Sequence, residues 1–165
     1  RLAALTDATQ YVVASHTHRE ALDVIEHALP AVFGPGVARL SRVHGAQRSD
    51  QVTDPTALGP ADCWALRTGH AFRSEPGARV RCPHVDPDVA AVCVPLGDGT
   101  TWTGVIVLRI GGASDRAHDV ATIALLDDAA RQLSTALANL RLRRALEEAA
   151  FRDPLTGIEI GRAHV

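Results

Sequence analysis

Two apolar stretches separated by a Gly-Asp-Gly turn place the strongest constraint on the fold of this chain. Residues 89–96 are apolar almost throughout, residues 101–110 alternate through Val105 and Val107, and Gly97-Asp98-Gly99 lies between them. Glycine and aspartate are typical of the tight turns that join neighbouring strands, so the pattern predicts a β-hairpin. Because a hairpin pairs its strands antiparallel, we expect an antiparallel sheet.

Helical periodicity flanks the hairpin on both sides. Residues 2–15 carry apolar side chains at helical spacing, and Thr17 followed by Glu20 is the signature of a capping box that opens a second helix over residues 18–32. After the hairpin, residues 115–152 predict one long helix of about 55 Å, at 1.5 Å per residue. A single small sheet does not need a helix of that length.

The region between the second helix and the hairpin predicts shorter elements. Pro30 and the Gly34-Pro35-Gly36 stretch are expected to end the second helix. The elements expected after it are a strand at 37–44, a loop at 45–60, a short helix from Pro60 to Thr68 that stops at Gly69, and a short strand at 70–73. This order predicts an α+β fold, with helices 2–15, 18–32 and 115–140 on one face of the antiparallel sheet and segment 45–88 on the other.

Composition excludes several classes of function. The net charge of −2 argues against a nucleic-acid binder that works by phosphate neutralisation. No apolar run approaches the eighteen residues of a membrane span, so we expect no membrane segment. Three cysteines at irregular spacing do not form a disulfide framework, and the simplest expectation is a reducing, cytoplasmic environment.

Cys63, Cys82, His84 and Cys93 are the residues with soft-ligand character. Thiolates and imidazole together suit zinc, copper, iron or haem, so Cys63, Cys82 and His84 are candidate metal ligands. In an extended strand Cys82 and His84 would face the same side and could share one ion. Cys93 lies within an apolar strand and is predicted to be a core residue. The alternative is a reactive thiol activated by His84 or Arg81.

Several short motifs resemble a known domain family. Asp153-Pro154-Leu155-Thr156-Gly157, directly after the long helix, is similar to the opening of the GGDEF domain of diguanylate cyclases. The stretch ahead of it resembles a GAF domain of a subgroup that commonly precedes GGDEF domains. The matching segments are Asp62-Cys63-Trp64-Ala65-Leu66-Arg67 with Gly69, Cys82-Pro83-His84, Cys93-Val94-Pro95-Leu96 and Gly104-Val105. The subgroup carries a histidine where this chain has Phe72, and His70 is two residues out of register.

The resemblance implies a non-catalytic sensory domain that controls a downstream diguanylate cyclase. It implies a GAF domain over 1–140, a connecting helix over 141–152 and the first residues of a truncated GGDEF domain over 153–158. Cys63, Trp64, Cys82 and His84 are then the candidate ligand-binding residues; the cofactor is unknown, with a metal ion or haem as candidates. Two alternatives stay open: a GAF-fold thiol enzyme such as a methionine sulfoxide reductase, and a ligand-free dimerisation module.

The long helix is the expected route of the signal. Leu133, Leu137 and Leu140 lie close to one stripe, and we expect its distal half to pair with a second copy of the chain. Asp153 is the expected end of this helix, because the residue before a proline is biased out of the helical region. Residues 159–165 resemble one reading frame of a sequencing-adapter DNA, so we expect them to be a non-native tail.

Overall fold

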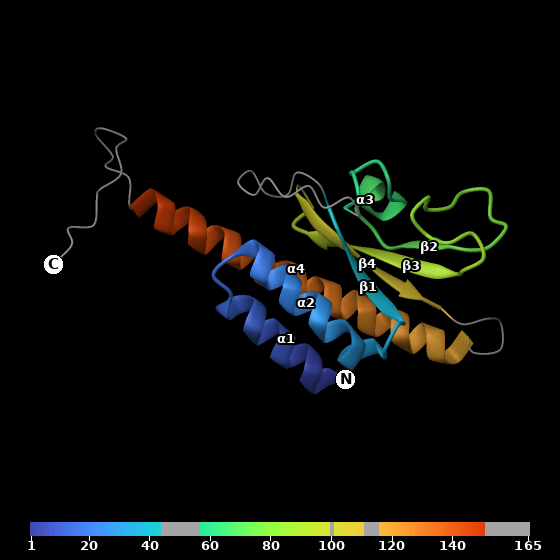
Figure 1. Cartoon of the computed structure of the whole chain (residues 1–165), viewed down its shortest axis with the longest axis horizontal. Coiled ribbons are helices and arrows are strands. Elements are labelled where there is room, and N and C mark those ends of the chain that lie inside the picture. The colour runs from blue at the N-terminus through green and yellow to red at the C-terminus, as the bar shows by residue number, and fades with distance from the viewer. Residues whose placement is uncertain (44–56, 100, 111–115, 151–165) are drawn as a thin grey trace.

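The computed structural model describes residues 1–43, 57–99, 101–110 and 116–150, and the chain folds into one sheet with helices on both faces (Figure 1). The helices and strands follow the order that the sequence predicts. They are α1 (Leu2–Ala14), α2 (His18–Phe33), β1 (Ala38–Arg42), α3 (Trp64–Thr68), β2 (Phe72–Ser74), β3 (Ala91–Gly97), β4 (Trp102–Arg109) and α4 (Arg116–Ala150).

The sheet is antiparallel throughout, with the strand order β1-β4-β3-β2. Strands β3 and β4 form the predicted hairpin, in which Val94 stands opposite Ile106. The α+β class and the antiparallel sheet are therefore confirmed. Strand β3 pairs with neighbours on both sides, and its alternate residues enter two different cores.

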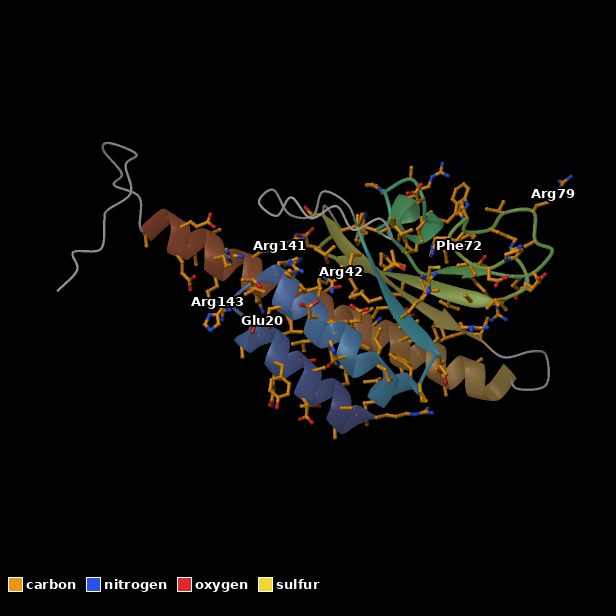
Figure 2. All side chains as sticks on the ribbon, viewed as in Figure 1. Glu20, Arg42, Phe72, Arg79, Arg141 and Arg143 are labelled. Carbon is orange, nitrogen blue, oxygen red and sulfur yellow. The ribbon has the colours of Figure 1, made fainter. Side chains whose placement is uncertain are left out.

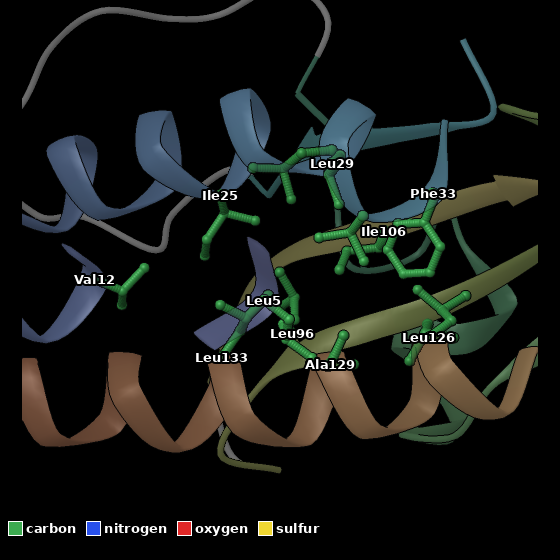
Figure 3. Packing of buried hydrophobic residues seen from close by; sticks show 14 of the residues in the cluster. Leu5, Val12, Ile25, Leu29, Phe33, Leu96, Ile106, Leu126, Ala129 and Leu133 are labelled. Atoms are coloured by element: carbon green, nitrogen blue, oxygen red, sulfur yellow. The ribbon is translucent and has the colours of Figure 1, made fainter. Parts of the chain in front are cut away.

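The larger core lies between the sheet and the three long helices (Figures 1 and 3). Val92, Val94 and Leu96 of β3 point into it, and α2 and α4 supply the opposite wall. The smaller core lies on the other face of the sheet, beneath α3 and the segment that leads to β3. Helices on one face and the α3 region on the other were predicted, and the structure confirms this arrangement.

Helix α1 differs from the expectation in one respect. It lies on the same side as α2 and α4, but it packs on these two helices and not on the sheet (Figure 1). Its buried residues Leu5 and Val12 contact the helical layer, which explains why α1 needs only a narrow apolar stripe. The result is a third layer over the distal half of α4.

This third layer corrects the expectation for the long helix. Leu137 and Leu140 were expected to extend past the fold and pair with a second copy, but they are only 1% and 2% exposed in the single chain. Together with Leu133 they belong to the main core, because α1 and α2 cover that part of α4. The exposed part of α4 begins after Leu140, where residues 142–150 are all exposed.

Two element boundaries differ from the predicted ones for local reasons. Pro30 lies inside α2 and does not end it; the amide of Gly34 still donates to the Pro30 carbonyl, and Gly34 ends the helix. Helix α3 begins at Trp64 and not at Pro60, and Gly69 ends it in the left-handed conformation as expected. Most of the loop 45–60, Asp153, the segment 153–158 and the tail 159–165 lie outside the described residues.

Candidate metal centre

Four side chains from three separate segments meet in the smaller core. Cys63 is the residue directly before α3, Cys82 and His84 lie in the connection between β2 and β3, and Cys93 is the third residue of β3. Their three sulfur atoms and one imidazole nitrogen all lie within 4.8 Å of one another. The predicted trio is therefore brought together, and Cys93 joins it.

The individual distances are those of groups arranged around one small centre. The sulfur atoms of Cys63 and Cys82 are 3.7 Å apart, and Nε2 of His84 is 3.7 Å from the sulfur of Cys93. All three cysteines are free and fully buried, with exposed fractions of 0%, 1% and 0%, while His84 is half-buried. Neighbouring thiols at this distance are in contact but are not bonded as a disulfide.

A turn, and not a strand, places Cys82 beside His84. The amide of Val85 donates to the Cys82 carbonyl at 3.1 Å, which closes a tight turn around Pro83 and His84. Residues 82–84 are therefore irregular, as predicted for 70–88, and not the extended backbone in which the two side chains would also share a side. The two side chains nevertheless converge.

Backbone amides hold Cys82 from two directions. The amide of Trp64 donates to the Cys82 sulfur at 3.4 Å, and the Cys82 amide donates to the hydroxyl of Ser74, a fully buried residue of β2. An amide aimed at a sulfur favours the thiolate, because the donor stabilises the negative charge. The start of α3 thus stabilises the anionic form of a cysteine 18 residues away.

The cluster also shifts the pKa values of its members. Hydrogen bonding to Cys63, and then to Cys93, lowers the pKa of Cys82 far below that of an ordinary thiol. Burial lowers the pKa of His84, but the hydrogen bonds and charges of Cys63 and Cys82 outweigh it and raise that pKa to about 9. Hydrogen bonding to Cys63 and Cys82, followed by burial, raises the pKa of Cys93. Both shifts favour the charged forms, a thiolate at Cys82 and an imidazolium at His84.

Aromatic side chains close the cluster on the side of α3 and β2. Trp64 and Phe72 stack with ring centres 6.1 Å apart, and the Arg67 guanidinium lies 4.0 Å from the centre of the Trp64 ring. Phe72 stands directly opposite Cys93 across the β2–β3 pair. The Trp64 ring therefore covers the cluster, whereas the group of Trp64 that bonds a cluster residue is its backbone amide.

The other face of β3 connects this cluster to α4. Cys93 points into the small core, whereas its neighbours Val92 and Val94 point into the core that α4 helps to form. At the end of the same strand the Gly97 amide donates to the hydroxyl of Ser134 on α4, at 3.1 Å. In the turn that follows, Asp98 forms an ion pair with Arg141 of α4, at 2.9 Å.

The sequence did not predict that Cys93 contacts the other three residues of the cluster. Cys93 is a core residue, as predicted, but its sulfur also lies against His84. Alternation along β3 provided a signal, because Cys93 falls on the opposite face from Val92, Val94 and Leu96. The pattern of the strand alone did not show that Cys63, Cys82 and His84 lie on that face.

Comparison with known proteins identifies the fold. No family model matches the sequence, and no curated protein matches it either. Among solved structures, the GAF domain of the potassium sensor histidine kinase KdpD from Escherichia coli is similar, with a TM-score of 0.58 at 15% identity; the match covers 90% of this chain and 100% of that one.

The GAF domains of two phosphoenolpyruvate-protein phosphotransferases are also similar in structure. The Acinetobacter domain has a TM-score of 0.55 at 13% identity, over 86% of this chain and 94% of its own. The Coxiella burnetii domain has a TM-score of 0.52 at 15% identity, over 87% and 96%. The chain thus has the fold of a GAF domain. Within the described residues, no helix is both long and apolar enough to cross a membrane.

Proposed function

We propose that this chain is a sensory GAF domain whose input is a ligand bound at the Cys63–Cys82–His84–Cys93 cluster and whose output is the position of α4. The observation that carries the proposal is the place of the cluster in the fold. It lies on one face of β3, and α4 packs on the other face of the same strand. A change at the cluster therefore acts on a strand that α4 contacts directly.

The contacts of β3 with α4 offer a short physical route. Cys93 is four residues from Gly97, whose amide is bonded to Ser134, and the next residue is ion-paired to Arg141. Packed interiors transmit small shifts because their side chains have few alternative arrangements. A displacement of β3 by ligand binding is expected to shift or rotate α4 through these two polar contacts.

The proposed output is a downstream diguanylate cyclase. The support is the Asp153-Pro154-Leu155-Thr156-Gly157 string, which follows α4 and is similar to the start of a GGDEF domain. Formation of cyclic di-GMP joins two GTP molecules, one from each of two catalytic domains, so the relative position of two such domains is a natural point of control. The fragment itself then binds and transmits, and the catalytic step belongs to the parent protein.

The proposal includes a homodimer formed by the distal part of α4. Leu142 and Leu146 are one helical turn apart and are each 61% exposed, on a segment that projects past the other helices (Figure 1). A helical end of about ten residues is marginal in water without a partner. A second copy that covers Leu142 and Leu146 would stabilise it and would bring the two following domains together.

Burial argues against the thiol-enzyme alternative. The three thiols have exposed fractions of 1% or less, and a sulfoxide substrate has to touch the attacking sulfur. A bound ion needs no such access once it is in place. Three free thiols in contact also favour a reducing compartment, and we therefore propose a cytoplasmic location.

The decisive experiment joins this chain, through its own α4, to an active diguanylate cyclase domain. Cyclic di-GMP formation is measured with the cluster loaded with metal and after removal of metal by a chelator. The proposal expects a change in rate of about tenfold, the effect of a coupling energy of about 1.4 kcal/mol. The same fusion carrying Cys82→Ser is expected not to respond. An equal rate in both states, with binding confirmed, contradicts the sensory proposal.

The dimer has its own test. Light scattering on the fragment is expected to show a dimer, and Leu142→Glu with Leu146→Glu is expected to give a folded monomer. Val120→Glu is the matched control, because Val120 is an equally exposed apolar residue near the other end of α4, at 67%. A wild-type fragment that stays monomeric at high concentration contradicts the dimer.

A further inference from the structure

We propose that Cys63, Cys82, His84 and Cys93 form a closed, tetrahedral site for one zinc-class divalent cation, with Cys93 as the fourth ligand and His84 bound through Nε2. The inference deepens the proposed function by naming its ligand. The role of the metal as a sensory input rests on the proposed function. The binding of the metal rests only on the geometry of these four residues.

The distances fit a four-coordinate ion. Zinc binds sulfur at about 2.3 Å and imidazole nitrogen at about 2.0–2.1 Å, so tetrahedral ligands lie about 3.8 Å apart for two sulfurs and about 3.6 Å for sulfur and nitrogen. The structure has 3.7 Å between Cys63 and Cys82 sulfurs and 3.7 Å from Cys93 sulfur to His84 Nε2. These two pairs are therefore already spaced as ligands of one ion, and all four ligand atoms lie within 4.8 Å of one another.

The donor set selects the ion. Three sulfurs and one imidazole are soft to borderline donors, which favour zinc over magnesium or calcium. Four protein ligands complete a tetrahedron, so no position is left for a reacting water, as in structural and regulatory zinc sites. The four residues cannot all surround a haem, because a planar macrocycle does not fit among ligand atoms that lie within 4.8 Å of one another.

The surroundings are those of a metal-bound thiolate. Cys82 receives the Trp64 amide on its sulfur, and its own amide is held by Ser74. Ala91, Val105 and Val107 supply apolar parts of the wall. In such a wall thiolates without a cation are costly, and a divalent ion removes that cost.

Zinc would also explain how the α3 side of the sheet keeps its shape. Residues 75–90 between β2 and β3 contain no helix or strand, yet Cys82 and Val85 in this connection are buried. Ligands from the residue before α3, from this connection and from β3 would tie the three segments together. Binding free energy at such a site is folding free energy, so this half of the domain gains stability from the ion.

Metal analysis and cobalt substitution test the site on the whole chain, purified under reducing conditions. We expect about one zinc ion per chain. Cobalt in its place should show the visible bands of a tetrahedral site and a thiolate-to-cobalt charge-transfer band set by three sulfurs. The Cys93→Ser variant should lose about one third of that band and bind zinc about 100-fold more weakly or worse. His70→Ala, an exposed histidine beside α3, is the matched control and should leave both unchanged.

A second variant covers the case in which Cys93→Ser does not fold. His84→Cys should convert the site to four thiolates, retain the metal and increase the charge-transfer band by about one third. Wild-type protein without stoichiometric metal binding overturns the proposal, and so does a Cys93→Ser variant that keeps the full band. A Cys63–Cys82 disulfide, detected as a loss of two hydrogen masses in protein purified under the same reducing conditions, also overturns it. Zinc binding with no effect on the fused cyclase would leave this site standing and contradict only the sensory proposal.

Discussion

Phe72 and Cys93 stand directly opposite each other on β2 and β3, so both side chains leave the sheet on the face that holds the cluster. Phe72 in turn stacks on Trp64, whose amide is bonded to the Cys82 sulfur. The aromatic pair therefore separates the cluster from solvent on that side.

Replacing this cover is expected to open the cluster. Phe72→Ala should cost about 2 kcal/mol of stability, less than a fully buried phenylalanine because Phe72 is only half-buried. In metal-free protein the thiols should then react faster with a thiol reagent. Tyr11→Ala is the control, since Tyr11 is an aromatic residue with 65% exposure and its loss should change stability by less than about 0.5 kcal/mol. An unchanged thiol reaction rate in Phe72→Ala would contradict the role as a cover.

Substitutions in the distal part of α4 should have very different effects on stability, depending on whether the residue is buried or exposed. Leu137→Ala is expected to lower the free energy of unfolding by about 3 kcal/mol, because Leu137 is 1% exposed and its loss leaves a cavity under α1. Leu142→Ala, five residues further on, should change monomer stability by less than about 0.5 kcal/mol. Urea unfolding of both variants at low protein concentration measures the difference. Equal effects would show that α1 does not cover α4 as described.

His18 should make the domain sensitive to acid. It lies at the start of α2, is 7% exposed, and burial, followed by the charges of Arg141 and Arg144, lowers its pKa to about 4. In the unfolded chain its pKa is about 6.5, so the unfolded state takes up a proton first as the pH falls. The stability that neutral His18 contributes is complete above about pH 6.5 and is lost between that value and about pH 4.

The loss should reach at most about 3 kcal/mol, the equivalent of a pKa difference of about 2.5 units. His18→Leu is expected to flatten the dependence of stability on pH in this window, relative to wild type in the same metal-loaded state. His16→Leu, at an exposed position two residues earlier, should leave the slope as it is. Chemical denaturation at a series of pH values gives the comparison. An identical slope for His18→Leu and wild type would rule out His18 as the source.

The contact between β3 and α4 should carry the signal in the fused cyclase. Ser134→Ala removes the acceptor of the Gly97 amide and is expected to reduce the metal-dependent change in rate while leaving zinc affinity unchanged. Ser134 is far along the chain from the cluster, so a loss of response with normal binding separates transmission from binding. Thr135→Ala serves as the control, because Thr135 is an exposed neighbour bonded only within its own helix. A full response in Ser134→Ala would show that the signal takes another route.

Arg143 provides a test of how α1 is fixed to α4. Its guanidinium donates to the carbonyls of Val13 and Ser15, at 3.0 and 2.6 Å, and so binds the C-terminal end of α1 (Figure 2). Arg143→Ala should lower stability by about 1 kcal/mol, the usual size for hydrogen bonds at a partly exposed site. Arg131→Ala, which removes only an exposed ion pair with Asp128, should have a smaller effect. Thermal unfolding of the two variants distinguishes them.

Turns and helix ends could be predicted from the sequence, because local chemistry controls them. The glycine–aspartate turn and its apolar flanks specified the β3–β4 hairpin, and Thr17 with Glu20 specified the start of α2. There the Glu20 amide donates to the Thr17 hydroxyl, while the Glu20 carboxylate accepts from the amide of His16, one residue before the cap. These signals succeed because a turn or a helix end is decided within a few residues. The soft ligands could likewise be named from the sequence, because the ability of cysteine and histidine to bind a metal is a property of the side chain itself.

Contacts between residues that are far apart in the sequence could be seen only in the tertiary structure. Cys93 became part of the cluster because β3 alternates between two cores, and Cys82 reached His84 through a turn that its residue types do not specify. Leu140 looked like a dimer contact because periodicity shows that a face is apolar but not what covers it. Here α1 and α2 cover it from the other end of the chain. Contacts between distant segments depend on the packing of the whole core, and no local pattern contains that information.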